Sequence, residues 1–375
     1  MKLPEKTNSD ASLPSIWLVI GDKPGDNAQV EIIAEALGLP FKIKRVLSKQ
    51  QFVFGKPDFK PSLYHLDPER SDQLEPPWPD FIFTIGSRPS MAALWIRKQS
   101  LQQSKIILLG RPKKWIEQFE LVIVPTQYNL PARPNILQLN LPLMRSNEAA
   151  IAAAAQSWNE RFSTLNKPVT ALLIGGPTKP FRFDADTANK IVRKTVAIVE
   201  ESGGTLYVST SRRTPLEVVT ALQANLPDNA LLYCWDADNT QANPYLALLG
   251  LADRFIVTGD SVSMMVEIAR LGKPLAIYSL PYQQDLGTKI RLFSSRTGKR
   301  GYHGSISSLL IKTISSLLRN TGLAGYTRDL TAIHELLYAQ NLAVPAGKPF
   351  LSGGRKAEDE VDRVTRRVRQ VIVAG

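Results

Sequence analysis

Short apolar runs recur through the second half of the chain, and each is followed by a polar or glycine-bearing loop and then by a helical pattern. The runs that predict strands are residues 169–174, 206–209, 231–235, 254–257 and 275–278. Runs that are apolar throughout are typical of strands buried on both faces of a sheet. Strands that alternate with helices predict a parallel sheet. The second half is therefore expected to form an open, doubly wound, Rossmann-like domain.

The first half shows the same alternation less regularly. Its predicted strands are residues 16–20, 41–46, 81–85, 105–109 and 121–124, and the stretch 48–79 is rich in proline and irregular. An alanine-rich segment at 146–165 predicts a helix between the halves, because alanine is the best helix former. The expected organisation is a Rossmann-like domain at 14–145, a helical connector at 146–165, a Rossmann-like nucleotide-binding domain at 166–300, and helices with a basic tail at 301–375.

Composition limits the kinds of site and partner. The chain of 375 residues has one cysteine and three histidines, so no metal site and no intramolecular disulfide are expected. No apolar stretch approaches the ~18 residues of a membrane span, and a cytoplasmic protein with at most peripheral membrane contact is predicted. The formal net charge of +12 favours anionic partners, such as phosphorylated substrates or an anionic membrane surface. Nucleic acid is not expected as a partner.

The C-terminal tail contains an amphipathic stripe. Val361, Val364, Val368 and Val371 share one helical face among arginines. Such a stripe can contact an anionic membrane, but the same pattern more often packs on its own protein, and packing is the favoured interpretation.

Polar loops follow three of the predicted strands in the second half. Ligands of open α/β sheets bind beyond the carboxyl ends of the strands. The loops contain Gly175-Gly176, Ser211-Arg212-Arg213 and Thr258-Gly259-Asp260-Ser261. Glycines let a backbone approach a phosphate, arginines match phosphate oxygens, and the helix that begins near Ser261 attracts an anion. Glu267, further along that helix, could accept hydrogen bonds from ribose hydroxyls. Each motif alone is more often a turn or a cap, and the prediction depends on their combination.

Several common nucleotide motifs are absent. The chain has no Gly-x-x-x-x-Gly-Lys-[Ser/Thr] loop and no Gly-x-Gly-x-x-Gly after either first strand. These absences count against a P-loop nucleoside triphosphatase and against a dehydrogenase.

The motifs together resemble those of the mitochondrial fission Elm-like family. The similar runs are residues 21–27 with Gln29, 86–88, 173–178, 211–215, 243–245 and 257–264. This family is itself similar to glycosyltransferase-B enzymes, in which the C-terminal domain holds a nucleotide-sugar donor and the N-terminal domain holds the acceptor. The resemblance therefore implies two Rossmann-like doubly wound parallel-sheet domains that face a cleft. The chain departs from the family pattern at residues 126–128 and 141–145, both in its first half.

The candidate nucleotide-binding residues follow from the loops and from the resemblance. They are Gly175, Gly176, Ser211, Arg212, Arg213, Asn243, Tyr245, Thr258, Gly259, Asp260, Ser261, Ser263, Met264 and Glu267.

The leading hypothesis is a glycosyltransferase-like protein. It would bind a nucleotide-diphosphate-sugar as substrate, need no other cofactor, and transfer the sugar to an unknown acceptor. Asp22 or Asp26 would be the general base, although both could serve only in turn formation and helix capping. The alternatives are a non-catalytic, membrane-associated adaptor of the mitochondrial-fission type and a nucleotide-sugar epimerase of the same fold.

Overall fold

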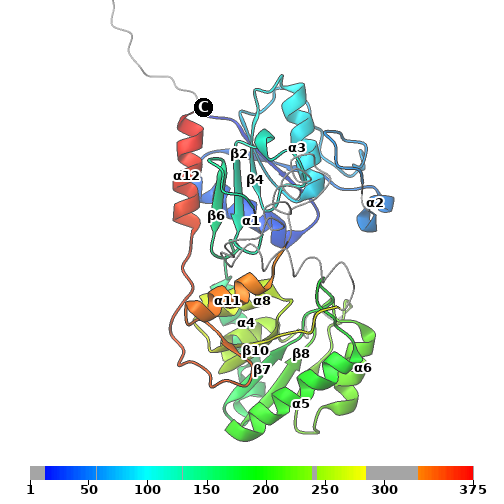
Figure 1. Cartoon of the computed structure of the whole chain (residues 1–375), viewed down its shortest axis with the longest axis vertical. Helices are drawn as coiled ribbons and strands as arrows, with labels where there is room; N and C mark the ends of the chain where they lie inside the picture. Colours follow the sequence, from blue (N-terminus) through cyan, green and yellow to red (C-terminus); the bar gives the residue numbers. More distant parts are fainter. Residues whose placement is uncertain (1–12, 56, 129, 239–242, 284–327, 375) are drawn as a thin grey trace, which may run out of the picture. The chain divides into compact units, whose positions relative to one another are not determined.

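The chain forms two compact units, each built on its own parallel sheet (Figure 1). The computed structural model describes residues 13–374 apart from 56, 129, 239–242 and 284–327. Of these, unit 1 contains residues 13–139 and 360–374, and unit 2 contains residues 140–283 and 328–359. The prediction of an α/β protein with two Rossmann-like, doubly wound parallel sheets is confirmed. That the units face one another across a cleft stays a prediction.

Unit 1 has a six-stranded parallel sheet in the order β2-β1-β3-β4-β5-β6. Its strands are β1 (Ile16–Ile20), β2 (Phe41–Arg45), β3 (Phe81–Ile85), β4 (Lys105–Leu109), β5 (Leu121–Pro125) and β6 (Ile136–Leu139). Its helices are α1 (Pro24–Leu37), α2 (Gln50–Phe54), α3 (Ser87–Gln99), the short 3-10 helix η1 (Ile116–Gln118) and α12 (Val361–Val373). Strands β1, β3 and β5 are buried along their whole length, as apolar runs covered by helices should be.

Unit 2 has a second six-stranded parallel sheet in the order β12-β11-β10-β7-β8-β9. Its strands are β7 (Val169–Leu173), β8 (Thr205–Ser209), β9 (Leu231–Tyr233), β10 (Arg254–Thr258), β11 (Leu275–Tyr278) and β12 (Val344–Pro345). Its helices are α4 (Glu148–Ser163), α5 (Ala185–Ser202), α6 (Leu216–Asn225), α7 (Tyr245–Leu251), α8 (Val262–Arg270) and α11 (Thr331–Ala339).

Local signals explain where several helices begin and end. Asp184 caps α5, since its side chain accepts a hydrogen bond from the Thr187 N–H at 2.9 Å. Helix α1 ends at Gly38, whose φ of 68° is in the left-handed region that glycine adopts readily.

Each sheet has one point at which its strand order reverses. In unit 1 the reversal lies between β1 and β3, and in unit 2 it lies between β7 and β10. In open α/β sheets, ligands bind at the carboxyl edge beside such a point. These two switch points position the candidate sites.

Helix α4 differs from the expected connector at 146–165. It packs along α7 and belongs to unit 2, and the division between the units falls at residues 139–140. The reason is its apolar face: Ile151 and Phe162 are buried, and the Phe162 ring stacks on Tyr207 with centroids 5.7 Å apart. The alanine-rich segment therefore forms part of a helical layer of unit 2.

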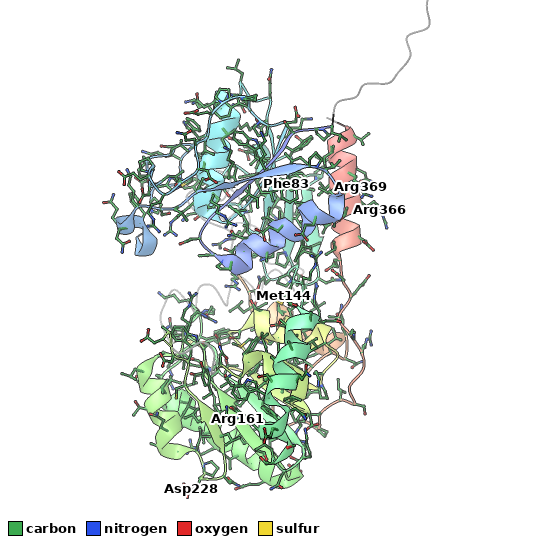
Figure 2. All side chains as sticks on the ribbon, turned by 180° about the vertical axis from the view of Figure 1, so that it is seen from behind. Phe83, Met144, Arg161, Asp228, Arg366 and Arg369 are labelled. Carbon is green, nitrogen blue, oxygen red and sulfur yellow. The ribbon has the colours of Figure 1, made fainter. Side chains whose placement is uncertain are left out.

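Helix α12 returns to unit 1 and packs against α1 and β5 (Figure 1). Val364 and Val368 are fully buried, and Arg369 donates hydrogen bonds to the last carbonyl groups of α1. The valine stripe therefore packs on its own protein and is not a membrane-binding face, while Arg366 and Arg369 lie on the exposed side (Figure 2). The predicted separate segment 301–375 is thus divided between the two units where it is described. In the described part of the chain, no helix combines the length and the apolar character needed to span a membrane.

Candidate functional site

Hydrogen bonds join the loops after β7 and β10 at the switch point of unit 2. The Gly175 N–H donates to Thr258 Oγ1 at 2.9 Å, and the Gly176 N–H donates to Asp260 Oδ2 at 2.8 Å. Side chains of the neighbouring loop therefore already occupy both glycine N–H groups.

Asp260 is the centre of this network. Its side chain is fully buried, and it accepts hydrogen bonds from the hydroxyls of Thr258 at 2.7 Å and Ser261 at 3.3 Å, besides the Gly176 N–H. Its Oδ2 also forms an ion pair with Arg213 Nη2 at 3.2 Å. A buried carboxylate is tolerated only with such partners, so Asp260 holds the loops together.

The loop after β8 joins the same network. The hydroxyls of Ser211 and Thr214 both donate to the Gly175 carbonyl oxygen, at 3.1 Å and 2.7 Å. Arg213 Nη1 donates to Thr178 Oγ1 at 2.9 Å, and its Nη2 lies 3.5 Å from Ser261 Oγ. The prediction that the three loops meet at one edge, with an arginine directed toward the start of α8, is confirmed.

The close approach of the loops requires glycine at two positions. A Cβ on Gly175 would lie 2.1 Å from Ser261 Oγ, and a Cβ on Gly176 would lie 2.3 Å from the Arg213 carbonyl oxygen. These glycines therefore allow loop to pack on loop.

Beside this closed network, three groups remain open to a ligand. Helix α8 begins at Val262 without a side-chain cap, so its first N–H groups are available. Arg212 is exposed and forms no hydrogen bond or ion pair with any described residue. The Arg213 side chain is 47% exposed despite its pairing with Asp260. Ser263 is also exposed, whereas Met264 packs against the core of unit 2.

The candidates Asn243, Tyr245 and Glu267 form a second cluster. Asn243 Oδ1 accepts from the Tyr245 N–H at 3.0 Å, so Asn243 forms an Asx turn just before α7. The Tyr245 hydroxyl donates to Glu267 Oε2 at 2.5 Å. Burial raises the pKa of both groups, although this hydrogen bond lowers that of Glu267.

His334 was not predicted as part of the site. It comes from α11, and its Nε2 lies 2.7 Å from the carbonyl oxygen of Gly259. Burial lowers the pKa of His334, so the neutral ring donates its Nε2 hydrogen to that carbonyl group. The local pattern around residue 334 predicts a helix and does not indicate this partner, which lies 75 residues away along the chain.

The proposed base candidates lie in unit 1. Asp22 and Asp26 line a small pocket at the switch point between β1 and β3, together with residues that follow β2 and β3.

The fold and this edge define the class of the protein: a two-unit, doubly wound α/β protein with a polar site at the carboxyl edge of its second sheet. The family model for mitochondrial fission ELM1 matches residues 24–313, and the chain therefore belongs to this family. Protein RP120 of Rickettsia prowazekii is 26% identical over 310 residues, which cover 74% of this chain and 86% of that protein. The mitochondrial fission protein ELM1 of Arabidopsis thaliana is 25% identical over 221 residues, covering 53% of this chain and 51% of that protein.

Solved structures with a similar trace include two UDP-GlcNAc 2-epimerases. The one from Neisseria meningitidis, bound to UDP-GlcNAc, has a TM-score of 0.47 and 11% identity, covering 96% of this chain and 100% of the other. The one from Methanocaldococcus jannaschii has a TM-score of 0.48 and 12% identity, covering 95% and 99%. A UDP-glucosyltransferase from Polygonum tinctorium has a TM-score of 0.42 and 10% identity, covering 96% and 98%.

Proposed function

We propose that unit 2 binds the nucleoside-diphosphate part of a nucleotide sugar, and that the protein is glycosyltransferase-like. The observation that carries the proposal is the contact of Arg213 with the uncapped start of α8 at the switch point between β7 and β10, with the exposed Arg212 beside it in the same loop. An uncapped helix N-terminus is an anion site, and guanidinium groups match phosphate oxygens. Switch points are where open α/β sheets bind nucleotides.

Each open group has a role in this binding mode. The diphosphate would accept hydrogen bonds from the first N–H groups of α8 and from Arg212. Arg213 would remain paired with Asp260, since the negative charge of that carboxylate would otherwise oppose an incoming anion. Glu267 in the second turn of α8 and Tyr245 at the start of α7 could receive the ribose hydroxyls.

The reaction would be attack by an acceptor hydroxyl on the anomeric carbon of the bound sugar. The bond from that carbon to the diphosphate breaks, and the nucleoside diphosphate leaves with its charge stabilised by the arginines. Asp22 or Asp26 would accept the proton of the acceptor hydroxyl.

Calorimetric titration tests the nucleotide site. Wild-type protein is titrated with UDP, ADP and GDP, and the tightest ligand is then used with Arg212→Ala and Arg213→Ala. A charge-assisted hydrogen bond contributes about 1.5–3 kcal/mol, so removing the engaged arginine should weaken binding by roughly ten-fold or more. Arg161→Ala is the matched control, because Arg161 lies in the last turn of α4, which leads into the opposite end of β7 (Figure 2).

The outcomes separate the alternatives. If both arginine variants bind as wild type does, the site is misplaced. Binding without transfer or hydrolysis of a nucleotide sugar would favour a non-catalytic adaptor of the mitochondrial-fission type, the process for which the Arabidopsis relative is named. A product that differs from the substrate at one sugar carbon would instead favour an epimerase.

A further inference from the structure

The buried residue His334 has no role in the binding mode proposed above, although it contacts a loop of the nucleotide site. It lies on α11 and is only 4% exposed, and its Nε2 lies 2.7 Å from the Gly259 carbonyl oxygen. A carbonyl oxygen only accepts hydrogen bonds, so the ring nitrogen is the donor. This hydrogen bond therefore joins α11 to the loop between β10 and α8.

The imidazole ring of His334 is packed closely between other parts of unit 2. A Cβ on Gly259 would lie 2.7 Å from Cε1 of the ring, so the ring can approach the loop this closely only because residue 259 is glycine. The ring also stacks on Phe181, with centroids 6.5 Å apart and an interplanar angle of 10°. Ile333 and Leu337 on the same helix are fully buried in the core of unit 2. The donor on His334 is therefore held in a fixed position.

Glycine at position 259 leaves the orientation of its own peptide group open, because a residue without a Cβ adopts more backbone conformations than any other. Two hydrogen bonds from outside the loop determine this orientation. The Gly259 N–H donates to the Tyr278 carbonyl oxygen at 2.9 Å, and His334 donates to the Gly259 carbonyl oxygen. The peptide bond is planar, so a fixed carbonyl group also fixes the direction of the next N–H, that of Asp260.

The turn that contains Gly259 leads directly into the proposed nucleotide site. The Ser261 N–H donates to the Thr258 carbonyl oxygen at 3.1 Å, and this hydrogen bond closes the turn. Helix α8 begins at the next residue, Val262, and its uncapped N–H groups are the proposed anion donors. The position of these donors therefore depends on how the turn is held.

We propose that His334 is a positioning residue of the nucleotide site: its hydrogen bond to Gly259 holds the turn between β10 and α8, and thereby fixes the position of the first N–H groups of α8. His334 acts through the main chain and does not touch the ligand. Its role in binding rests on the proposed function of unit 2, whereas its role in holding the turn does not.

Titration of the full-length protein with UDP, ADP or GDP, whichever binds wild type most tightly, tests the role in binding. His334→Leu keeps a buried side chain but removes the donor, and it should weaken binding by about three- to ten-fold, the contribution of one neutral hydrogen bond. His334→Gln supplies an N–H donor of similar reach and should restore most of the affinity. The control Ile333→Val shortens a buried side chain of the same helix, and should bind as wild type does even if its melting temperature falls.

Hydrogen exchange of the ligand-free protein tests whether His334 holds the turn. The N–H groups of Gly259, Ser261 and Met265 each donate to a backbone carbonyl oxygen. In His334→Leu these three amides should exchange about three- to ten-fold faster than in wild type. They should exchange at nearly the wild-type rate in His334→Gln and in Ile333→Val. If the ring only filled space in the core, His334→Leu and Ile333→Val would affect these amides alike.

The proposal is overturned if His334→Leu binds the nucleotide as wild type does, or if its three turn amides exchange at the wild-type rate. If wild type binds none of the three nucleotides, the proposed function fails together with the role of His334 in binding, while the exchange result still decides whether His334 holds the turn.

A measurement on the wild-type protein decides the matter if His334→Leu does not fold. Burial lowers the pKa of His334, so its ring is neutral at neutral pH and carries a single hydrogen. Nitrogen NMR of the ring should find this hydrogen on Nε2, where it is donated to Gly259. A hydrogen on Nδ1 instead would overturn the proposal, because Nε2 could not then donate.

Discussion

Glu267 lies in the second turn of α8, where its carboxyl group is partly buried and accepts a hydrogen bond from the Tyr245 hydroxyl. Burial raises the pKa of Glu267, since desolvation disfavours the charged form more than the hydrogen bond favours it. At pH values above the usual glutamate pKa of about 4.3, Glu267 therefore keeps a proton in the folded state that it has already lost in the unfolded state. This linkage makes the free energy of unfolding fall as the pH rises through that window.

Glu267→Gln removes the titration while keeping an oxygen that can accept from Tyr245. Below the unfolded pKa the two proteins should have similar stability, because neutral glutamate resembles glutamine. As the pH rises from about 4 to 7, the variant should become progressively more stable relative to wild type. Urea unfolding at intervals across this range measures the difference. A difference that stays constant, or changes in the opposite direction, would contradict the assigned environment.

At the scale of elements, the site at the carboxyl edge of the unit 2 sheet is held together by loops whose main chains are in direct contact, with no side chains between them. The main chain at Gly176 approaches the carbonyl group of Arg213 so closely that a methyl group would lie 2.3 Å from the oxygen. The segments that follow β7 and β8 can therefore meet only while residue 176 is glycine. Their contact in turn places Arg213 against Asp260.

Gly176→Ala should lower the free energy of unfolding by about 1–3 kcal/mol, the usual cost of overpacking. The matched control is Gly25→Ala in the first turn of α1, where a Cβ would meet nothing within 4 Å. That variant should be neutral or more stable by a few tenths of a kcal/mol, because alanine restricts the unfolded chain. Urea midpoints at constant m-value compare the two proteins. Equal losses in both variants would show that loop contact is not the cause.

At the scale of the whole molecule, the chain leaves unit 1 after residue 139, forms unit 2, and returns to unit 1 with α12. Unit 1 therefore includes helix α12 as well as the described residues up to Leu139. Val368 contributes a fully buried side chain to this closing contact.

Val368→Ala should destabilise unit 1 by roughly 2 kcal/mol through lost burial and a small cavity. The two units need not unfold together, so a single global unfolding transition would not measure the stability of unit 1 alone. Hydrogen exchange resolves the effect: α1 and β5 should exchange faster while β7 and β10 remain unchanged. Arg366→Ala, on the exposed side of the same helix, should alter neither unit. Faster exchange throughout unit 2 would argue against α12 as a part of unit 1 alone.

The apolar runs by themselves determined the two parallel sheets, because a strand covered on both faces must be apolar along its length. Strands β6 and β12 were missed for the converse reason: each lies at the edge of its sheet, and residues such as Gln138 and Pro345 are exposed. The topology also predicted that the polar loops of unit 2 would meet, since parallel strands share a carboxyl edge.

Only the tertiary structure decided which hydrogen bonds those loops form with one another. The hydrogen bonds from Gly175 to Thr258 and from Gly176 to Asp260 join residues 83 and 84 positions apart. No local pattern encodes such a partner, because the same glycine can serve a phosphate, a turn or a neighbouring loop. The place of α12 was decided in the same way. Its valine stripe predicts an apolar contact of some kind, and only the folded chain supplies the surface of α1 that buries it.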